Sequence, residues 1–422
     1  MSRNLKLALS LSAAIIASPV VAKEGYDDAA KVARLNHVYL IMMENHGYGQ
    51  IIGNPNAPFI NDWANKANLA QNYFGVGHPS LTNYLEIVGG SNFGVRSDNY
   101  PDWHSATCHP NLSTGAPNLD GPTSSGLVCP IAGTGTDAAT PAVDCSNEYA
   151  SPACGNDIDG VKSYAAAANI DGRTIADQLS RAGLSLKDYQ ESLPLSGPDA
   201  VNISDGQYSN LTDFTKITPT LTPPLTSAGI VAAYAVKHNP FLYFANNQTG
   251  HGSVPYSKIA PFDGKDGLWA DLAAGKSPVF SYIVPNQCND QHGRGNAGPF
   301  CNYDPTSNGT QAGLNPALIQ LGDITLNKMV TAIKASPSWS QGRNAIFVVW
   351  DENDYSTQPN TNQVVMIVDA NFGPHGVKSG VYYNHFSLLK TLEGALGLPC
   401  LNHACDKNTE AMTDLIGQSD RR

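Results

Sequence analysis

Two apolar runs constrain the fold of this chain more than any other feature. HVYLIMM (37–43) and NAIFVVWDEN (344–353) are apolar at almost every position until an acidic residue follows. A strand that is apolar on both faces must be covered on both sides, as in a parallel sheet flanked by helices. Further strand candidates are PFLYFAN (240–246), VFSYIVPN (279–286) and NQVVMIVD (362–369).

Helical stretches alternate with these strands. The predicted helices span 79–90, 172–183, 321–336 and 386–399, and several end at glycine or proline. Strands that alternate with helices predict an α/β fold whose sheet is covered on both faces.

The first 22 residues are typical of a secretory signal. Arg3 and Lys6 precede an apolar stretch, and Ala22 offers a small residue for cleavage. A membrane anchor is the alternative, but the stretch is shorter than the roughly 20 residues that span a bilayer. We therefore expect export to the periplasm or the medium, with residues 23–422 forming a single domain.

The chain has few charged residues and a negative net charge. Charged residues make up 14% of the sequence, and the formal net charge is −11. Loss of the two basic residues of the signal would lower it to −13. An acidic surface argues against nucleic acid as a partner, although a local positive site could still bind an anion.

All eight cysteines follow the signal region. An even number of cysteines in an exported chain favours disulfides, and eight allow 105 connectivities. Zinc binding is a weaker alternative, because the sequence contains no CxxC motif. The simplest pairing joins sequence neighbours: Cys108–Cys129, Cys145–Cys154, Cys288–Cys301 and Cys400–Cys405. Residues 100–160 carry four of these cysteines, and we interpret them as a disulfide-tied, loop-rich insertion.

Acidic residues and asparagine end both apolar runs. Glu44 and Asn45 follow the first run, and Asp351, Glu352 and Asn353 belong to the end of the second. In an open α/β sheet, ligands bind beyond the carboxyl ends of the strands. Such oxygen ligands suit a divalent cation, whereas the alternative is that each pair only caps its own turn.

A serine and several histidines complete the candidate site. Ser80 lies at the predicted start of a helix, where it could be an ordinary N-cap or a nucleophile beside an anion site. His238, His251 and His292 lie near strand candidates, and His385 precedes a helix. Neutral imidazole can bind a metal, and imidazolium can hold phosphate or protonate a leaving oxygen.

Six motifs together resemble one family. They are MMENHGYGQIIGN, HPSLTNYLEIVGGS, HNPFLYF, YIVPNQCNDQHG, VVWDEND and YNHFSLLKTLEGALGLP. In this order they are similar to the bacterial and fungal phosphoesterases that include secreted acid phosphatases and phospholipases C. This family belongs to the alkaline-phosphatase-like superfamily, so the resemblance implies an α/β/α sandwich with a central, mostly parallel sheet.

The resemblance also implies roles for individual residues. Ser80 matches the nucleophile, and His238 and His292 match histidines near the phosphate. Asn83 and His251 are the expected substrate-binding residues. The expected ligands of a divalent cation are Glu44, Asn45, Ser80, Asp351 and Glu352. Few lysines or arginines lie near the motifs, so the metal and the histidines would supply most of the positive charge.

The implied reaction has two steps. Ser80 attacks phosphorus to form a phosphoserine, a histidine protonates the leaving alkoxide, and water then hydrolyses the intermediate. We expect an acid phosphatase that acts on small phosphate monoesters. A phosphodiesterase of the phospholipase C type, acting on phospholipid headgroups, is the alternative, and a non-catalytic secreted binding protein is a third possibility.

Overall fold

A computed structural model describes most of the chain outside its amino terminus, two long segments and several short ones. The described residues are 29, 31–93, 95, 170, 172–192, 234–248, 252–254, 258–293, 300–306, 308–354 and 361–419. The signal region, the 100–160 insertion with its two cysteine pairs, and His251 lie outside them.

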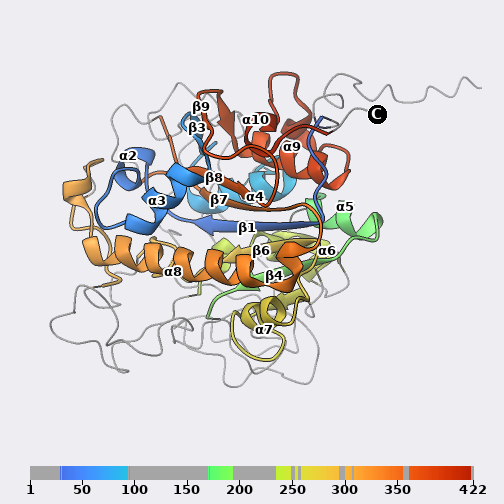
Figure 1. Ribbon diagram of the computed structural model, residues 1–422, viewed down its shortest axis with the longest axis horizontal. Helices are drawn as coiled ribbons and strands as arrows, with labels where there is room; N and C mark the ends of the chain where they lie inside the picture. Colours follow the sequence, from blue (N-terminus) through green and yellow to red (C-terminus); the bar gives the residue numbers. More distant parts are fainter. Residues whose placement is uncertain are drawn as a thin grey trace, which may run out of the picture.

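Within these residues, eight strands form one sheet in the order β5-β4-β6-β1-β7-β8-β2-β9 (Figure 1). The strands are β1 (His37–Met43), β2 (Asn68–Ala70), β4 (Leu186–Gln190), β5 (Ile259–Ala260), β6 (Phe280–Val284), β7 (Asn344–Trp350), β8 (Met366–Ala370) and β9 (Lys378–Ser379). Neighbouring strands are parallel except where β8 pairs with β7 and with β2. The expected mostly parallel sheet is confirmed.

Helices cover both faces of this sheet. In the view of Figure 1, α7 (Leu268–Ala273) and α8 (Pro316–Ala335) lie below β1, whereas α4 (Ser80–Gly89) and α9 (His385–Leu396) lie above it. Contacts hold each layer together, since α8 packs on α7 and on α3 (Pro58–Lys66), and α4 packs on α9 and on α5 (Ile175–Arg181). This arrangement confirms the α/β/α fold class. Short elements complete it: α2 (Tyr48–Ile51), α6 (Ala245–Gln248), α10 (Thr413–Ile416), and a separate parallel pair of β3 (Tyr73–Phe74) with β10 (Tyr383–Asn384).

The two apolar runs of the sequence are adjacent central strands. β1 lies between β6 and β7, and β1 and β7 pair in parallel along their whole length, from His37 opposite Asn344 to Met43 opposite Trp350. Apart from His37, all residues of both strands are buried. Because the strands end at the same level, the acidic residues that follow them emerge side by side.

One strand prediction was wrong. Residues 240–246 form a 3-10 helix, Pro240–Tyr243, followed by the start of α6. Proline at the first helical position costs no hydrogen bond there, which favours a helical turn. The run is apolar because Phe241 and Tyr243 are fully buried, and burial alone does not distinguish a short strand from a helical turn.

Two other elements depart from the sequence-based expectation. α8 begins at Pro316, before the predicted start at residue 321, because the Asn315 side chain accepts a hydrogen bond from the Ala317 N–H and caps the helix. β4 has the sequence LKDYQ and was not predicted, because it contains three polar residues. It pairs with β6 and places Asp188 beside Tyr282 inside the sheet.

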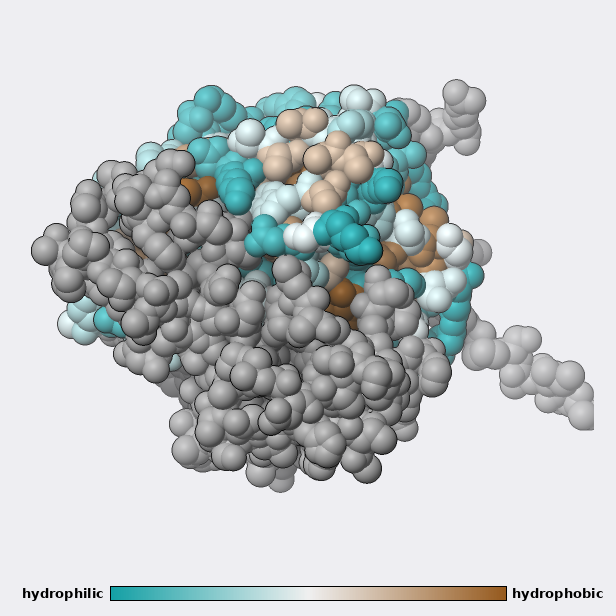
Figure 2. Space-filling model, turned by 90° about the horizontal axis from the view of Figure 1, so that it is seen from below, coloured by the Kyte–Doolittle hydropathy of each residue, from teal (hydrophilic) through white to brown (hydrophobic). Residues whose placement is uncertain are grey.

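No described helix is both long and apolar enough to cross a bilayer. On the face shown in Figure 2, teal hydrophilic residues surround a limited area of paler brown ones.

Asp188 is a buried carboxyl group in the middle of β4. It is fully inaccessible, and the Gln190 Nε2–H donates to its Oδ1 at 2.8 Å. Burial raises its pKa to about 7, against the opposing effect of hydrogen bonds from Gln190 and Asn239. The folded chain therefore holds a proton on Asp188 over a pH range in which the unfolded chain releases it.

We expect Asp188→Asn to remove this pH dependence of stability. An unfolded aspartate titrates near pH 4, so the wild-type free energy of unfolding should fall between pH 4 and 7, by at most about 1.4 kcal/mol per pH unit from this residue. Thermal unfolding at several pH values should show equal melting temperatures near pH 4 and a growing advantage of the variant up to pH 7. The exposed control Asp62→Asn should follow the wild type, and a constant difference across the range would contradict the argument.

Candidate active site

The carboxyl ends of β1 and β7 bring two acidic segments together. The Asp351 N–H donates to the Met43 carbonyl oxygen at 3.0 Å, and the Asn45 N–H donates to Asp351 Oδ1 at 3.1 Å. Asn45 adopts a left-handed conformation with φ 57°, which asparagine tolerates better than most residues. The two turns are therefore linked to each other directly, as the end-of-strand argument predicted.

Ser80 is the first residue of α4, directly after Pro79, which caps the helix. Its hydroxyl is buried, and its Oγ lies 3.1 Å from Glu44 Oε2 and 3.2 Å from Glu352 Oε1. The helix dipole at the start of α4 favours an anion at this position. The structure thus brings together the predicted nucleophile and a predicted ligand from each acidic turn.

Asn83 holds the serine segment in place. Its Oδ1 accepts hydrogen bonds from the N–H groups of Val76 and Gly77, both at 3.0 Å. Its Nδ2 donates to the Gly77 carbonyl at 2.9 Å and to Glu352 Oε2 at 3.0 Å. Two donors and two acceptors are all that this side chain has. Asn83 is therefore better suited to positioning Glu352 and the turn before Ser80 than to the predicted substrate contact.

A histidine at the start of α9 contacts the backbone of Asp351. His385 Nε2 donates to the Asp351 carbonyl oxygen at 2.6 Å, which leaves Nδ1 to accept from the Tyr73 hydroxyl at 2.9 Å. Burial lowers the pKa of His385 to about 4, so it is neutral, as these two contacts require. Burial and the neighbouring Glu352 raise the pKa of Asp351 well above its usual range. Its Oδ2 is buried and makes no hydrogen bond within the described part of the chain.

His238 lies between two acids. Its Nε2 is 3.0 Å from Glu44 Oε1, its Nδ1 is 3.3 Å from Asp290 Oδ2, and its ring stacks on Tyr84 with centroids 5.2 Å apart. Burial lowers the pKa of His238 well below its usual value, and the charge of Lys237 lowers it further. Burial and the nearby Glu44 raise the pKa of Asp290. Both ring nitrogens of His238 therefore lie within 3.3 Å of a carboxyl oxygen, one from Glu44 and one from Asp290.

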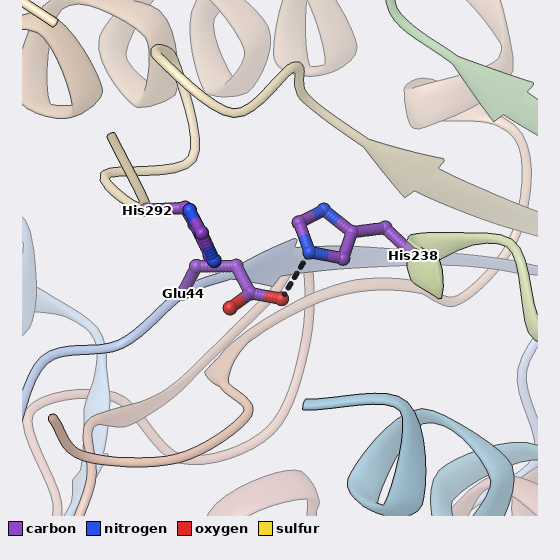
Figure 3. A group of neighbouring side chains, drawn as sticks. All are labelled: Glu44, His238 and His292. Atoms are coloured by element: carbon purple, nitrogen blue, oxygen red, sulfur yellow. Dashed lines mark ion pairs between the residues drawn. The ribbon is translucent and has the colours of Figure 1, made fainter. Parts of the chain in front are cut away.

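His292 approaches Glu44 from the loop after β6. Its N–H donates to Asp290 Oδ1 at 2.7 Å, and its Nδ1 lies 2.8 Å from the Gly293 carbonyl oxygen. Figure 3 shows the side chains of Glu44, His238 and His292 pointing toward one another from three separate segments. One ligand atom from each lies within 4.8 Å of the others, so this trio is a group that could hold a metal ion.

The loop that carries His292 is closed by a disulfide. Cys288 pairs with Cys301, with Cα atoms 5.0 Å apart, and Cys400 pairs with Cys405 at 5.2 Å. Both pairs match the expected connectivity. The first pair spans the segment that contains His292, whereas the second follows α9 at the end opposite to His385.

A family comparison identifies the chain. The profile of the phosphoesterase family matches residues 54–299, more than half of the sequence. The chain belongs to the phosphoesterase family. It is a hydrolase that acts on phosphoric ester bonds, which excludes the non-catalytic alternative. The match includes Ser80, His238 and His292, whereas Glu44 and Asp351 lie outside it.

Individual relatives of this phosphoesterase have low sequence identity to it, but the alignments cover most of the chain. It is 25% identical over 412 residues to the phosphatidylinositol-3-phosphatase of Mycobacterium tuberculosis, covering 96% of this chain and 92% of that protein. It is 21% identical to an acid phosphatase of Aspergillus fumigatus, covering 93% of this chain and 62% of that protein. A solved structure of an alkaline phosphatase superfamily protein from Vibrio parahaemolyticus matches with TM-score 0.43 and 10% identity, covering 90% and 72% of the two chains.

Two residues of this phosphoesterase site were missed by the sequence analysis. Asp290 contacts both histidines, and Lys237 places its Nζ 3.1 Å from His292 Nε2. Lys237 immediately precedes the motif residue His238, and Asp290 lies within a quoted motif, two residues before His292. Their charge next to a predicted site residue was the available signal. Lys237 adds one positive charge beside the motifs, where the sequence analysis expected few lysines or arginines.

We expect loss of the Cys288–Cys301 disulfide to affect catalysis more than loss of the other pair. Replacing both cysteines by alanine should lower the free energy of unfolding by about 2–4 kcal/mol. It should also lower kcat roughly 10-fold or more, because small displacements of a site residue are costly. The matched control, Cys400→Ala with Cys405→Ala, should lose stability with kcat unchanged. Equal kcat in both double variants, measured below their melting temperatures, would contradict a role for this disulfide in positioning His292.

Proposed function

We propose that this chain is an exported, metal-dependent acid phosphatase that hydrolyses phosphate monoesters through a phosphoserine on Ser80. The position of the Ser80 hydroxyl carries the proposal, since its Oγ contacts a carboxylate from each acidic turn at the start of α4. The names of the two relatives, a phosphatidylinositol-3-phosphatase and an acid phosphatase, support a monoesterase. Residues 1–22 would be removed on export, and 23–422 would form the catalytic domain.

The contacts of Ser80 fit a bound cation. A hydroxyl has one proton, so it can donate to only one of the two carboxylate oxygens within 3.2 Å of Oγ. The other contact sets oxygen lone pairs against each other unless a positive charge lies between them. Glu44, Asp351 and Glu352 are all buried, and the Asp351 Oδ2 makes no hydrogen bond in the described part of the chain. This hard-oxygen set suits a divalent cation.

The residues that would hold the cation are Glu44, Asn45, Ser80, Asp351 and Glu352. A divalent cation would lower the pKa of the serine hydroxyl and offset charge on the phosphoryl oxygens. Glu44, His238 and His292 form a second candidate group that shares Glu44 with the first. Nitrogen ligands in the second group would favour a softer transition metal or zinc.

The chain itself accounts for the proton transfers. In the first step the Ser80 Oγ forms a bond to phosphorus, its proton passes to Glu44 Oε2, and the bond to the leaving alkoxide breaks. His238 can protonate the alkoxide from Nε2 while a protonated Asp290 passes its proton to Nδ1, so that the ring stays neutral and Asp290 becomes a carboxylate. In the second step water forms a bond to phosphorus and the bond to Ser80 Oγ breaks. Glu44 returns its proton to Oγ, and a proton of the attacking water passes to His238 and restores the His238–Asp290 pair.

A phosphodiesterase remains the second candidate for this site. The relatives' names favour the monoesterase, and the described residues do not include the 100–160 insertion. Comparison of p-nitrophenyl phosphate with p-nitrophenylphosphorylcholine separates the two. The monoester should be hydrolysed faster, and a faster diester would favour the phospholipase C reaction.

We expect Ser80→Ala to lower kcat for p-nitrophenyl phosphate by at least about a thousandfold, because the nucleophile is absent. The fold should persist, since the hydroxyl is one small group at a helix start. Ser281→Ala is a matched control on β6, since that buried hydroxyl makes no hydrogen bond in the described chain. Substantial turnover by a folded Ser80→Ala protein would overturn the phosphoserine mechanism.

Metal removal should abolish activity and reveal which group binds the ion. Dialysis against a chelator should eliminate phosphate release, and added divalent metal should restore it. Elemental analysis should show loss of metal from Glu352→Gln, which removes a ligand of the oxygen set only. His292→Ala should retain the metal if the oxygen set holds it. Metal lost from His292→Ala but kept by Glu352→Gln would assign it to the histidine group.

A further inference from the structure

Tyr84 is a buried aromatic residue of α4 that contacts a histidine of the candidate active site. Its ring stacks on the ring of His238, with centroids 5.2 Å apart and an angle of 4° between the two planes. Both side chains are buried. The short 3-10 helix Val236–His238 packs against α4, so the two rings meet where their own elements are in contact. Stacked rings at this separation attract each other beyond the effect of burial alone.

The stacked pair links His238 to the proposed nucleophile. Ser80 and Tyr84 are four residues apart on α4, so they lie on the same face of the helix, one turn apart. His238 Nε2 lies 3.0 Å from Glu44 Oε1, and Glu44 Oε2 lies 3.1 Å from Ser80 Oγ. The four residues therefore form a closed cycle of contacts that begins and ends on α4.

The contacts at the edge of the imidazole do not by themselves fix its plane. The nitrogens of His238 lie 3.0 Å from Glu44 and 3.3 Å from Asp290. An imidazole held only at these two atoms could still tilt about the line that joins them. The ring of His292 is also near, with centroids 5.6 Å apart, but its plane is inclined by 59°. The parallel face of Tyr84 is the contact that opposes such a tilt.

The aromatic face of Tyr84, and not its hydroxyl, makes this contact. The hydroxyl is buried and makes no hydrogen bond within the described part of the chain. Its removal therefore costs no hydrogen bond that the structure describes. Phenylalanine would present the same face to His238, whereas an aliphatic side chain would not.

We infer that Tyr84 is a positioning residue whose ring holds the imidazole of His238 at the angle needed for proton transfer to the leaving group. This inference rests on the proposed phosphatase function, in which His238 protonates the leaving alkoxide. A proton donor must lie within hydrogen-bond reach of the atom that it protonates, and small displacements are costly. Tyr84 acts on the reaction through His238 alone.

Removal of the aromatic face tests this role. Tyr84→Leu should lower kcat/KM for p-nitrophenyl phosphate about 10-fold. The loss should reach about 100-fold for glycerol phosphate, because a basic alkoxide depends more on a proton donor than p-nitrophenolate does. Tyr84→Phe keeps the face and should recover the kcat/KM of the wild type for both substrates. Equal losses for the two substrates, or a Tyr84→Phe protein as slow as Tyr84→Leu, would overturn the inference.

A double-variant cycle shows whether Tyr84 acts through His238. Once His238→Gln has removed the imidazole, addition of Tyr84→Leu should lower kcat/KM no further. Losses that multiply in the double variant would mean that the two residues act independently, and they would overturn the role of Tyr84.

Phe262 provides a matched control. It is a fully buried aromatic residue between β5 and α7, and its ring meets that of Trp269 edge-on with centroids 5.6 Å apart. Phe262→Leu should lower the melting temperature and leave kcat/KM unchanged for both substrates. The same substrate-dependent loss in Phe262→Leu would show a general effect of core damage and would contradict a specific role of Tyr84.

The outcomes separate this inference from the proposed function. If Tyr84→Leu does not fold, Tyr84→Met takes its place, because methionine fills an irregular space without presenting a flat face. Wild-type kcat/KM in a folded Tyr84→Leu or Tyr84→Met protein would overturn the role of Tyr84 and leave the phosphatase function standing. Activity retained by Ser80→Ala would instead overturn the phosphoserine mechanism, whereas the cycle would still measure the coupling between Tyr84 and His238.

Discussion

The arrangement of the candidate site depends on the carboxylates that are buried at the ends of two parallel strands. β1 and β7 pair in register, so Glu44 and Asp351 leave the sheet next to each other, and both are fully inaccessible. Removing like charges from water and placing them together is unfavourable unless positive charge or protons compensate. The histidines, Lys237 and the start of α4 all lie where such compensation is needed.

A count of formal charges shows how the compensation would work. Three ionised carboxylates, Glu44, Asp351 and Glu352, carry −3, and a divalent cation with the Lys237 ammonium would supply +3. The site would then be neutral before substrate binds, since His385 and His238 are neutral and a protonated Asp290 adds no charge. An arriving phosphate would then need positive potential from the start of α4. With a cation bound, such a balance would offset the charge of the buried lysine among these acids.

The sequence predicted the sheet and the acidic edge because both follow from simple rules. Continuous apolar runs indicate strands buried on both faces, and residues that follow parallel strands collect at one edge. The sequence did not predict those elements whose conformation depends on tertiary contacts. β4 contains Asp188, which is buried only because β6 and its neighbours enclose it, and residues 240–246 turn into short helices despite an apolar composition.

In the candidate site, too, some features could be predicted from the sequence and others could not. Glu44, Ser80 and Glu352 could be brought together from strand-end and helix-start rules, and the structure brings them into contact. The pairing of Lys237 with His292 could not be foreseen, because 55 residues separate them and no local pattern links the two. Asn83 was expected at the substrate, yet its amide is fully used inside the chain. Local sequence identifies reactive residue types, whereas hydrogen-bond partners depend on the fold.

The loop after β6 is anchored to the strands that carry the acids. The Glu44 N–H donates to the Asp290 carbonyl at 2.9 Å, and Trp350 Nε1–H donates to Gln291 Oε1 at 3.0 Å. The Asn286 N–H donates to the Glu191 carboxylate, which follows β4, at 2.9 Å. These bonds tie the loop to β1, β7 and β4 at once. Movement of His292 relative to Glu44 would therefore break contacts with the sheet itself. The charges of the site are thus held in place before any substrate arrives. Such preorganisation is the condition for effective electrostatic stabilisation of a transition state.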